Sequence, residues 1–397
     1  MKSLLKKILP SFLIEWYHFG LAFLGVVIYR LPSRNLKIIG VTGTNGKSTT
    51  VEFMAKIFED AGIKAASQSS IRFKIGEKEW PNTYKMTMPG RFFIQKFIRQ
   101  AKDAGCKYII LEVTSEGIKQ FRHKFINFDT AVFTNLSPEH IESHGGFENY
   151  RAAKGKLFEA TKNSHIINID DENTKYFLGF TAKKKYTYGL NQGDINTQNT
   201  HFGLKLSGNF NVYNALAAIC VGISQGITKE ICEKAVGKIE TMPGRMEEII
   251  SSPKVVVDYA FTPNALEKVY QTLKPANGKM ICVLGACGGG RDKWKRPVLG
   301  KIAAEYCDKI ILTNEDPYDE NPSKIIEQVA EGTGGKEEKV LDRREAIGHA
   351  IKSAEKNDVV IITGKGCEPW LCIQGGKKIP WDDREIAKEE FDKINKN

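Results

Sequence analysis

The 397-residue sequence contains eight cysteines but no C-x-x-C pair, and several of the cysteines lie inside apolar runs. This distribution argues against a disulfide framework and against a zinc site, and it fits a reducing cytoplasm best. The chain also lacks a short-period repeat and a low-complexity tract. No basic stripe interleaved with aromatic residues accompanies the net charge of +11, so nucleic acid is not an expected partner.

The rest of the composition is that of a soluble globular protein, with 41% apolar and 26% charged residues. The length predicts two or three domains rather than a single core. A lysine-rich solvated surface is the favoured explanation of the basic charge, although an anionic small substrate or a membrane surface would explain it as well.

Residues 1–35 have an unusual pattern, in which lysines precede the apolar stretch 12–29. This stretch is borderline for a spanning helix, which needs about 20 predominantly apolar residues. A spanning orientation would also leave those lysines outside, against the positive-inside bias, and no small-residue cleavage site marks a secretory signal. Two interpretations stay open: contact with a membrane surface, or a helical hairpin around Gly20 and Gly25 that packs on the protein itself.

Residues 37–61 have the pattern of a strand, a glycine turn and a helix. Apolar residues lead into a turn with two glycines at 42–46, and helical spacing follows over 47–60. Glycines let backbone N–H groups turn toward phosphates at the positive end of the following helix. Lys47 would then reach the β- and γ-phosphates, and Ser48 would hold Mg²⁺.

This loop does not match the G-x-x-x-x-G-K-[ST] pattern in full, because Val41 stands in place of the first glycine. An ordinary turn is the alternative, but the strand-to-helix setting favours a nucleotide loop. The residues expected to bind ATP there are Gly43, Thr44, Asn45, Gly46, Lys47, Ser48 and Thr49.

Short apolar strands alternate with helical stretches along the rest of the chain, which is typical of a parallel sheet covered on both faces. Proline and glycine break the pattern at 241–245, and a second series follows. The sequence therefore predicts an α/β protein with an apolar segment 1–35, a central ATP-binding domain 36–242 and a C-terminal domain 243–397. Later strands are expected at 108–113, 130–134, 165–169, 255–258, 280–284, 309–312 and 359–362, and helices at 91–104, 150–161, 212–224 and 229–239.

Polar residues at two strand ends are candidate metal ligands. Ligands of open α/β sheets bind beyond the carboxyl ends of strands, so Glu112 is placed to hold a metal near the phosphates. His140 and His144 follow the next strand, but no third soft ligand with zinc spacing accompanies them. From first principles, His140 would be an unusual ligand for Mg²⁺, which prefers oxygen.

Nine motifs follow one another over residues 40–368: TGTNGKST, LEVTS, NLSPEHIESHG, ENYRAAKGKLF, GNFNVYNALAA, MPGRMEEI, VVVDYAFTPNAL, GGGRDKWKRP and GKGCE. This set resembles the Mur ligase family, and within it the MurE type, which adds the third amino acid to UDP-N-acetylmuramoyl-dipeptide. The resemblance implies a P-loop-containing central domain with a mostly parallel sheet and a C-terminal Rossmann-like α/β domain.

The resemblance also implies a role for individual residues. Glu112 and His140 match the ligands of a second Mg²⁺, and Lys154 matches a lysine that these ligases carry as a carbamate. Without the resemblance, Lys154 would be taken for an ordinary surface lysine. The implied catalytic set is Lys47, Glu112, His140 and Lys154, and the implied magnesium ligands are Ser48, Glu112 and His140.

Further contacts are implied for both substrates and for ATP. The implied ATP contacts outside the loop are Asn211 and Asn214 near adenine, and Arg245 and Asp258 in the C-terminal domain. The positions that match contacts to the nucleotide-peptide are Thr87, Thr114, Gln120 and Arg122, and those that match contacts to the amino acid are Arg291, Gly364 and Glu368.

These residues support amide-bond formation driven by ATP. A carboxylate attacks the γ-phosphate to form an acyl phosphate, and an amine displaces the phosphate to leave an amide. The expected cofactors are ATP, Mg²⁺ and a carbamylated Lys154, and the expected partners are a muropeptide precursor and an amino acid. The expected location is the cytoplasm, with membrane-surface contact through residues 1–35.

The chain departs from the family pattern at several places, among them the family's DYAHT, which reads DYAFT at 258–262, and its GKGHE, which reads GKGCE at 364–368. Residues 1–35 are too few for the domain with which MurE-type ligases grip the uridine nucleotide, which would allow a lipid-linked acceptor. The family's Asn-Thr-Thr-Pro loop reads MTMP at 86–89, and its Asp-Asn-Pro-Arg loop reads EDPY at 315–318. Tyr318 cannot make a bidentate pair with the distal carboxylate of diaminopimelate, so the acidic residues before it would suit an amine such as lysine, although Arg291 is still available.

Two other functions stay open. A polyglutamate-type ligase, either similar to folylpolyglutamate synthase or a membrane-associated poly-γ-glutamate synthase, would use the same chemistry on another acceptor. A regulatory or transport ATPase would hydrolyse ATP without forming an amide. Amino-acid-dependent phosphate release would exclude this last function.

Overall fold

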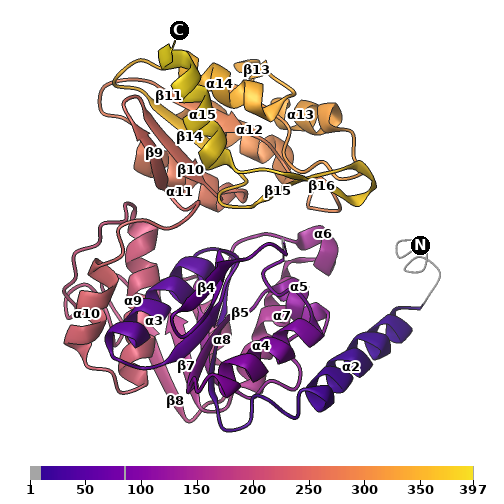
Figure 1. Ribbon diagram of the computed structural model, residues 1–397, viewed down its shortest axis with the longest axis vertical. Coiled ribbons are helices and arrows are strands. Elements are labelled where there is room, and N and C mark those ends of the chain that lie inside the picture. Colours follow the sequence, from indigo (N-terminus) through magenta and orange to yellow (C-terminus); the bar gives the residue numbers. More distant parts are fainter. Residues whose placement is uncertain (1–9, 85, 397) are drawn as a thin grey trace. The chain divides into compact units, whose positions relative to one another are not determined.

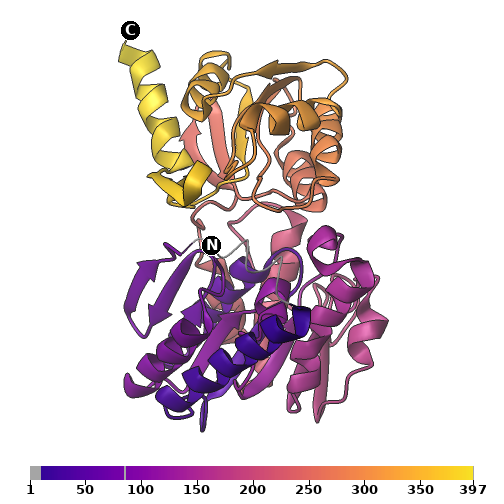
Figure 2. The same ribbon diagram turned by 90° about the vertical axis from the view of Figure 1, so that its right-hand side faces the viewer.

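The computed structural model describes residues 10–84 and 86–396, so the lysines at the start of the apolar segment lie outside the described residues. By its internal contacts the chain divides into two compact units, which are coloured along the sequence in Figure 1 and Figure 2. The first unit comprises Met1–Leu136, Phe147–Leu204 and Asn211–Lys238, and the second comprises Ser137–Gly146, Lys205–Phe210 and Ile239–Asn397.

The first unit is built on a sheet which, within the described residues, has eight strands in the order β4-β3-β2-β5-β1-β6-β7-β8. Strands β2, β5, β1, β6, β7 and β8 run parallel, whereas β3 and β4 extend one edge as antiparallel strands. The central strands are apolar and buried, as expected where both faces are covered. The strands are β1 Lys37–Thr42, β2 Ala65–Gln68, β3 Arg72–Ile75, β4 Lys78–Pro81, β5 Tyr108–Glu112, β6 Phe128–Phe133, β7 Ser164–Asn168 and β8 Lys184–Tyr188.

Helices cover both faces of this sheet (Figure 1). On one face α3 packs against β1, β2 and β5 and is itself covered by α10. On the other face, one hydrophobic cluster joins apolar side chains of α4, α5 and α7 to the sheet. The helices are α3 Lys47–Asp60, α4 Arg91–Asp103, α5 Ser115–Lys119, α7 Phe147–Ala160, α8 Thr174–Leu178, α9 Asn209–Ser224 and α10 Lys229–Gly237.

The apolar N-terminal stretch forms one helix, α2 (Ser11–Ile28), which lies beside α4. A Cβ atom at Gly25 would lie only 3.7 Å from Gln95 Cγ, so the two helices approach closely there. The interpretation as a helical hairpin was wrong, because Gly20 and Gly25 both continue the helix, where a glycine costs only about 1 kcal/mol. None of the helices in the described part of the chain has the length and apolarity that a bilayer-spanning segment requires.

The second unit is built on a sheet of six strands among the described residues, in the order β13-β12-β11-β14-β10-β9, and only β9 is antiparallel to its neighbour. Helices α11, α12 and α13 pack on one face, and α14 and α15 pack on the other. The strands are β9 Glu247–Ser251, β10 Lys254–Asp258, β11 Met280–Leu284, β12 Lys309–Leu312, β13 Glu337–Lys339, β14 Val359–Thr363, and the separate hairpin β15 Trp370–Ile373 and β16 Lys377–Pro380. The helices are α6 Ile141–His144, α11 Pro263–Leu273, α12 Lys295–Tyr306, α13 Pro322–Ala330, α14 Arg343–Lys352 and α15 Asp383–Lys396.

A buried ion pair joins α14 to the C-terminal helix α15. Arg343 donates from Nη2 to Asp383 Oδ2 at 2.6 Å and from Nε to Asp383 Oδ1 at 2.9 Å. Arg343 Nη2 also donates to the carbonyl oxygen of Thr363 at 2.8 Å. The bidentate geometry and the third acceptor compensate for the desolvation of two fully buried charges.

The predicted fold class is confirmed, because both units are α/β layers with mostly parallel sheets. The seven later strands occur within two residues of the bounds expected from their apolar runs. The sequence did not predict the short or polar strands β2, β3, β4, β8, β9, β13, β15 and β16. All eight cysteines belong to the described residues and are free thiols.

Candidate functional site

The loop between β1 and α3 requires glycine at two positions. Gly43 has φ of +150°, and a Cβ atom there would lie 1.9 Å from Thr134 Oγ1. Gly46 has φ of +81°, and its Cβ atom would lie 2.2 Å from Asn214 Oδ1. Because neither position has room for a side chain, the loop can turn tightly into α3, whose positive N-terminal end favours an anion.

Residues just beyond β6 hold this loop in place. The carbonyl oxygen of Asn135 accepts from Thr44 N at 2.8 Å, and its Oδ1 accepts from Asn45 N at 2.9 Å. Thr134 Oγ1 and Asn135 Nδ2 donate to the carbonyl oxygen of Asn45 at 2.8 and 3.0 Å. Sequence reasoning missed this role of Thr134 and Asn135. The signal in the sequence was that both residues follow an apolar run and that Asn135 begins the motif NLSPEHIESHG.

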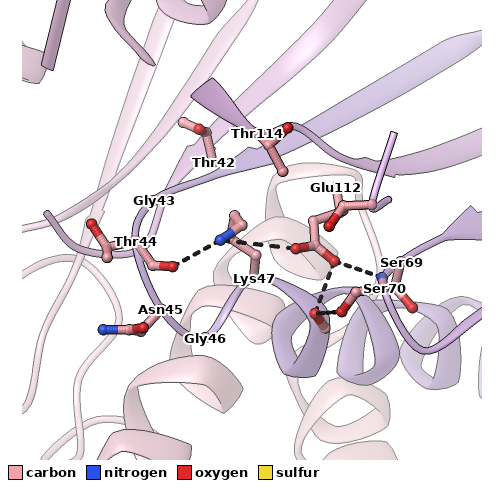
Figure 3. A network of polar contacts seen from close by, with 12 residues as sticks. Thr42, Gly43, Thr44, Asn45, Gly46, Lys47, Ser69, Ser70, Glu112 and Thr114 are labelled. Carbon is pink, nitrogen blue, oxygen red and sulfur yellow. Dashed lines mark hydrogen bonds and ion pairs between the residues drawn. The ribbon is translucent and has the colours of Figure 1, made fainter. Parts of the chain in front are cut away.

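Lys47, Ser48 and Glu112 converge at the start of α3, where Figure 3 shows Lys47 and Glu112. Lys47 Nζ donates to the carbonyl oxygen of Thr44 at 2.8 Å and lies 3.8 Å from Glu112 Oε1. Glu112 Oε2 accepts from Ser48 Oγ at 2.8 Å and from Ser70 N at 2.9 Å. Ser48 Oγ is also 2.7 Å from the Oγ of Ser70, another residue that sequence reasoning missed.

The oxygen donors of this cluster fit Mg²⁺. The ion usually takes one or two carboxylates from a protein and completes its octahedron with substrate phosphates and water. The Ser48 hydroxyl and the Glu112 carboxylate are hard ligands of this kind. Over residues 10–84 and 86–396, no group of three or more His, Cys, Asp or Glu side chains is arranged to hold a metal ion. A magnesium ion here would therefore take most of its ligands from the nucleotide and from water.

Two asparagines expected near adenine lie behind the loop on α9. Asn214 Nδ2 donates to Asn211 Oδ1 at 3.2 Å, and both side chains are buried. Thr50 Oγ1 lies 3.4 Å from Asn214 Oδ1 and also donates to the carbonyl oxygen of Gly46 at 2.9 Å. The structure therefore brings Asn214 against the glycine loop and Asn211 next to Asn214. Thr49 lies buried in the first turn of α3.

Lys154 is not a surface residue, since only 2% of it is exposed. It projects from α7 and donates from Nζ to the carbonyl oxygen of Gly43 at 2.6 Å. Its ammonium lies 4.5 Å from the centroid of the Tyr150 ring, and Tyr150 Oη lies 3.0 Å from Thr44 Oγ1. The fold therefore places a buried lysine at the beginning of the glycine loop.

Residues expected to hold the acceptor cluster around α5 and the segment that follows it. Thr114 caps α5 by accepting from Gly117 N at 3.1 Å. Arg122 donates from Nη2 to Gln120 Oε1 at 2.8 Å, and its Nη1 donates to the carbonyl oxygen of Met88. Thr87 lies in the same loop as Met88, and its carbonyl oxygen accepts from the side chain of Gln68.

A second arginine lies beside this cluster. Arg91 donates from Nε to the carbonyl oxygen of Gln120 at 2.8 Å. Burial lowers the pKa of Arg91 to about 10, and the positive charge of Arg122 adds to this lowering. Burial also lowers the pKa of Arg122. Two partly desolvated guanidinium groups at one place would favour an anionic ligand.

In the second unit, Arg245 and Asp258 lie next to each other in the fold. Asp258 Oδ2 accepts from Met246 N and Oδ1 accepts from Ala260 N, both at 2.7 Å. Burial raises the pKa of Asp258, and Arg245 and the two N–H groups oppose that rise. The Arg245 guanidinium lies 4.3 Å from the ring centroid of Tyr259, which orients it by a cation–π contact.

Glu368 belongs to a buried charge network around Lys365. Lys365 Nζ donates to Asp316 Oδ2 and to Glu368 Oε2, each at 2.8 Å. Asp316 Oδ1 accepts from Cys372 N at 2.7 Å, and Tyr259 Oη donates to Glu368 Oε1 at 2.9 Å. The interpretation that Asp316 would take a substrate amine does not fit this network, because both of its oxygens are bonded within the protein.

Gly364 has a steric role in the same place. It has φ of +104°, and a Cβ atom there would lie 2.0 Å from Glu315 Oε2. Glu315 is itself buried. The positive φ and the short distance to Glu315 both require glycine, so Gly364 allows the chain after β14 to pass close to the carboxylate.

The segment Ser137–Gly146 belongs to the second unit. Asp292 accepts from Ile141 N at 2.9 Å and from Glu142 N at 3.1 Å. A buried ion pair at 2.8 Å joins Glu139 to Lys295.

On this segment His140 has φ of +57°, and its Nε2 lies 3.5 Å from Arg291 Nη1. The structure therefore places one expected metal ligand beside one expected amino-acid contact. Joint ligation of a magnesium ion by His140 and Glu112 stays a prediction.

The sequence matches two family models, one on either side of the break at 241–245. The Mur ligase middle domain matches residues 41–222. The Mur ligase, glutamate ligase domain matches residues 244–366.

Individual relatives agree with these matches. The UDP-N-acetylmuramoyl-L-alanyl-D-glutamate--2,6-diaminopimelate ligase of Syntrophomonas wolfei subsp. wolfei is 36% identical over 400 residues, which cover 93% of this chain and 81% of the relative. A solved structure of a ligase with the same name is 30% identical, with a TM-score of 0.59 over 91% of this chain and 79% of that chain. The folylpolyglutamate synthase of Mycobacterium tuberculosis shares the fold at 16% identity, with a TM-score of 0.69 over 86% of this chain and 91% of that chain.

Proposed function

Because the chain belongs to the Mur ligase family, we propose that it is an ATP-dependent ligase that joins the carboxylate of a muropeptide precursor to the amine of an amino acid. The observation that carries the proposal is the convergence of Lys47, Ser48 and Glu112 beside the glycine loop. The acceptor carboxylate attacks the γ-phosphorus of ATP, and the bond to the β-phosphate oxygen breaks to release ADP. The amine then attacks the acyl phosphate, loses a proton and expels phosphate.

The residues of the loop act mainly by position and charge. Lys47 neutralises charge on the transferring phosphoryl group, and the first N–H groups of α3 point toward the same phosphates. Ser48 and Glu112 would hold Mg²⁺, which supplies further positive charge against the phosphate oxygens. Glu112 lies 2.8 Å from Ser48 Oγ and 3.8 Å from Lys47 Nζ, an arrangement that supports a joint role in phosphoryl transfer.

We propose that the acceptor is of the class found in the relatives' name, UDP-N-acetylmuramoyl-L-alanyl-D-glutamate. Its phosphates and carboxylates are anionic, and the guanidinium groups of Arg91 and Arg122 would favour such a ligand. Thr114 and Gln120 would contribute neutral hydrogen bonds beside these charges. The supply of ATP makes the cytoplasm the expected place of the reaction.

We also propose that Lys154 works as a carbamate. The neutral amine adds to carbon dioxide and loses a proton, which converts a buried cation into an anion with two oxygens. The nitrogen keeps one N–H group, which can still donate to the carbonyl oxygen of Gly43, as Nζ does at 2.6 Å. Oxygen ligands of this kind suit Mg²⁺.

The incoming amino acid is, in this proposal, a diamino acid. The relatives' name specifies 2,6-diaminopimelate, whereas Tyr318 lacks the guanidinium that would pair with a distal carboxylate. Arg291 could pair with one carboxylate of the substrate. Lysine and diaminopimelate are therefore the two amino acids to compare first.

The test is a phosphate-release assay with purified protein, ATP, Mg²⁺ and UDP-N-acetylmuramoyl-dipeptide, run against a panel of amino acids, with the product identified by mass spectrometry. The proposal predicts phosphate release that needs both the acceptor and a diamino acid. Dihydrofolate with glutamate is included in the panel, because folylpolyglutamate synthases share the fold. ATP hydrolysis that is indifferent to every acceptor and amino acid would instead indicate an ATPase that makes no amide.

A further inference from the structure

Helix α2 presents an apolar face to solvent. The exposed positions recur with the 3–4-residue spacing of one helix face and continue into the residue three beyond its end. Between 43% and 70% of each side chain is accessible. Within the described helix this face contains no charged residue, and it consists of Leu13, Trp16, Tyr17, Leu24, Val27, Ile28 and Leu31.

The opposite face of α2 packs against the first unit. Ala22 and Val26 are buried, and the helix packs on α4 through the close approach at Gly25. Figure 1 and Figure 2 both show α2 lying along the outside of the first unit next to α4. The exposed face is therefore not the side that packing on α4 requires.

The segments that α2 contacts are rich in basic residues. Segments 11–36, 91–103 and 119–127, which are joined by the contacts of α2, contain nine basic and two acidic residues. One of the two acidic residues, Asp103, is paired with Arg99 at 2.9 Å. The other, Glu15, lies on α2 about 160° around the helix axis from the centre of the apolar face. With nine basic and two acidic residues, the region that includes α2 has a net charge of +7.

We propose that the exposed face of α2 is a docking surface for an anionic lipid bilayer. An interfacial helix inserts its apolar side chains to a depth of about 5–10 Å and is assisted by cations that attract anionic headgroups. Trp16 and Tyr17 are the residue types that collect at the membrane interface, where an apolar ring meets a polar edge. A second copy of the chain fits less well, because pairing two such faces would bring two of these basic regions together.

Two other aromatic side chains of α2 reach the segment of the proposed acceptor site. The ring of Phe19 on α2 lies 6.1 Å from the ring of Phe121, and the ring of Phe23 lies 5.7 Å from that of Phe125. Phe121 is the residue between Gln120 and Arg122, which are the expected acceptor contacts. Resting on the proposed function, this adjacency would bring the acceptor site close to the bilayer surface.

Co-sedimentation of the full chain with vesicles tests the docking surface. We expect binding to vesicles of equal phosphatidylcholine and phosphatidylglycerol, weaker binding to phosphatidylcholine alone, and a loss of binding at high salt. The double variant L24E/V27E places two charges on the face, and its affinity for the vesicles should be lower by a factor of about ten or more. Because both side chains are half exposed, its circular dichroism spectrum and its thermal unfolding curve should match those of the unmodified chain.

The matched control is L341E/I379E, which adds the same two charges at similarly exposed apolar positions of the second unit and should leave vesicle binding unchanged. The proposal is overturned if the unmodified chain sediments with neither vesicle, or if L24E/V27E binds as well as it does. A dimer that L24E/V27E dissociates, in a chain without vesicle binding, would assign the face to a second copy. This assay contains neither ATP nor amino acid, so it can succeed or fail independently of the ligase assay.

Discussion

Burial changes the chemical role that the side chain of Lys154 can have. On a solvated helix a lysine contributes little beyond its charge, but here Nζ is removed from water and donates to the first carbonyl of the glycine loop. In its neutral form an amine can react with carbon dioxide. The position therefore supports both a structural hydrogen bond and the proposed carbamate.

The substitution Lys154→Ala separates these two roles. We expect amide formation to fall by about a hundredfold or more, because charge that stabilises phosphoryl transfer is lost. Adding a short carboxylic acid should restore part of the activity, since it can supply the missing oxygens. Steady-state assays with and without the acid measure this, and the exposed Lys156→Ala is the control that should stay active. An alanine variant as active as the unmodified chain would remove Lys154 from the mechanism.

His123 is another buried polar side chain, and its burial should make the stability of the protein depend on pH. Only 3% of it is exposed, and neither ring nitrogen has a hydrogen-bond partner within the described part of the chain. Burial lowers the pKa of His123 from 6.5 to about 3, and the positive charges of Lys124 and Lys156 add to this. The folded first unit therefore holds a neutral imidazole at a pH where the unfolded chain would be protonated.

This difference predicts a loss of stability in mild acid. Below the unfolded pKa of 6.5 the unfolded state binds a proton that the folded state does not, so stability falls as the pH falls toward about 3. Between about pH 7 and pH 5 the linkage amounts to about 2 kcal/mol. Denaturant unfolding of the first unit should show this loss, His123→Leu should remove it, and the exposed His201→Leu should retain it. An identical pH dependence in His123→Leu would contradict the assignment.

At the scale of the element, α3 has a glycine with positive φ at each end, and the two differ in their surroundings. A Cβ atom at Gly46 would meet the amide of Asn214 at 2.2 Å, whereas one at Gly62 would have nothing within 4 Å. Both substitutions impose left-handed strain of roughly 1 kcal/mol on a residue with a side chain. Only the first also displaces a neighbour in the expected nucleotide site.

We therefore expect Gly46→Ala to weaken ATP binding by about tenfold or more, because the loop must shift away from the phosphates. Gly62→Ala should change only the stability of the chain. Titration calorimetry with Mg²⁺ and a non-hydrolysable ATP analogue compares the two affinities, and unfolding curves compare the two stabilities. Equal losses of affinity would show that strain in α3, and not the crowding at Asn214, determines nucleotide binding.

At the scale of the molecule, each of the two units has a core of its own, and the glycine loop belongs to the first. A ligand that binds only the folded state stabilises it in proportion to its occupancy. The two units need not unfold together, so a single midpoint for the whole chain would not be meaningful.

Mg²⁺ with an ATP analogue at about 100 times its Kd should stabilise the first unit by about 2.7 kcal/mol. EDTA should remove most of this stabilisation, since Ser48 and Glu112 would then lack the ion that joins them to the phosphates. Calorimetric scans with and without the chelator measure the effect. Lys47→Ala should lose the stabilisation even with Mg²⁺ present, and a shift that persists in that variant would argue against the glycine loop as the nucleotide site.

Much of the fold is predictable from local pattern. The buried parallel strands are continuous apolar runs, so strands such as Met280–Leu284 and Lys309–Leu312 coincide with the stretches expected from the sequence. The edge strands were missed because they are short and polar, as in Glu337–Lys339, where pairing with a neighbour and not composition makes the strand. The hairpin expected near Gly20 and Gly25 failed because glycine permits a turn without requiring one.

The sequence alone determined the order of the buried apolar strands along the chain, the glycine loop with Lys47 and Ser48, and membership of the family, because these depend on residues close together in the chain or on motifs. Only the tertiary structure decided that Ser70 and Glu112 meet Ser48, that Lys365 neutralises Asp316, and that α2 turns an apolar face to solvent. These contacts join residues far apart in the sequence. Their distances follow from how strands and helices pack, which no local pattern specifies.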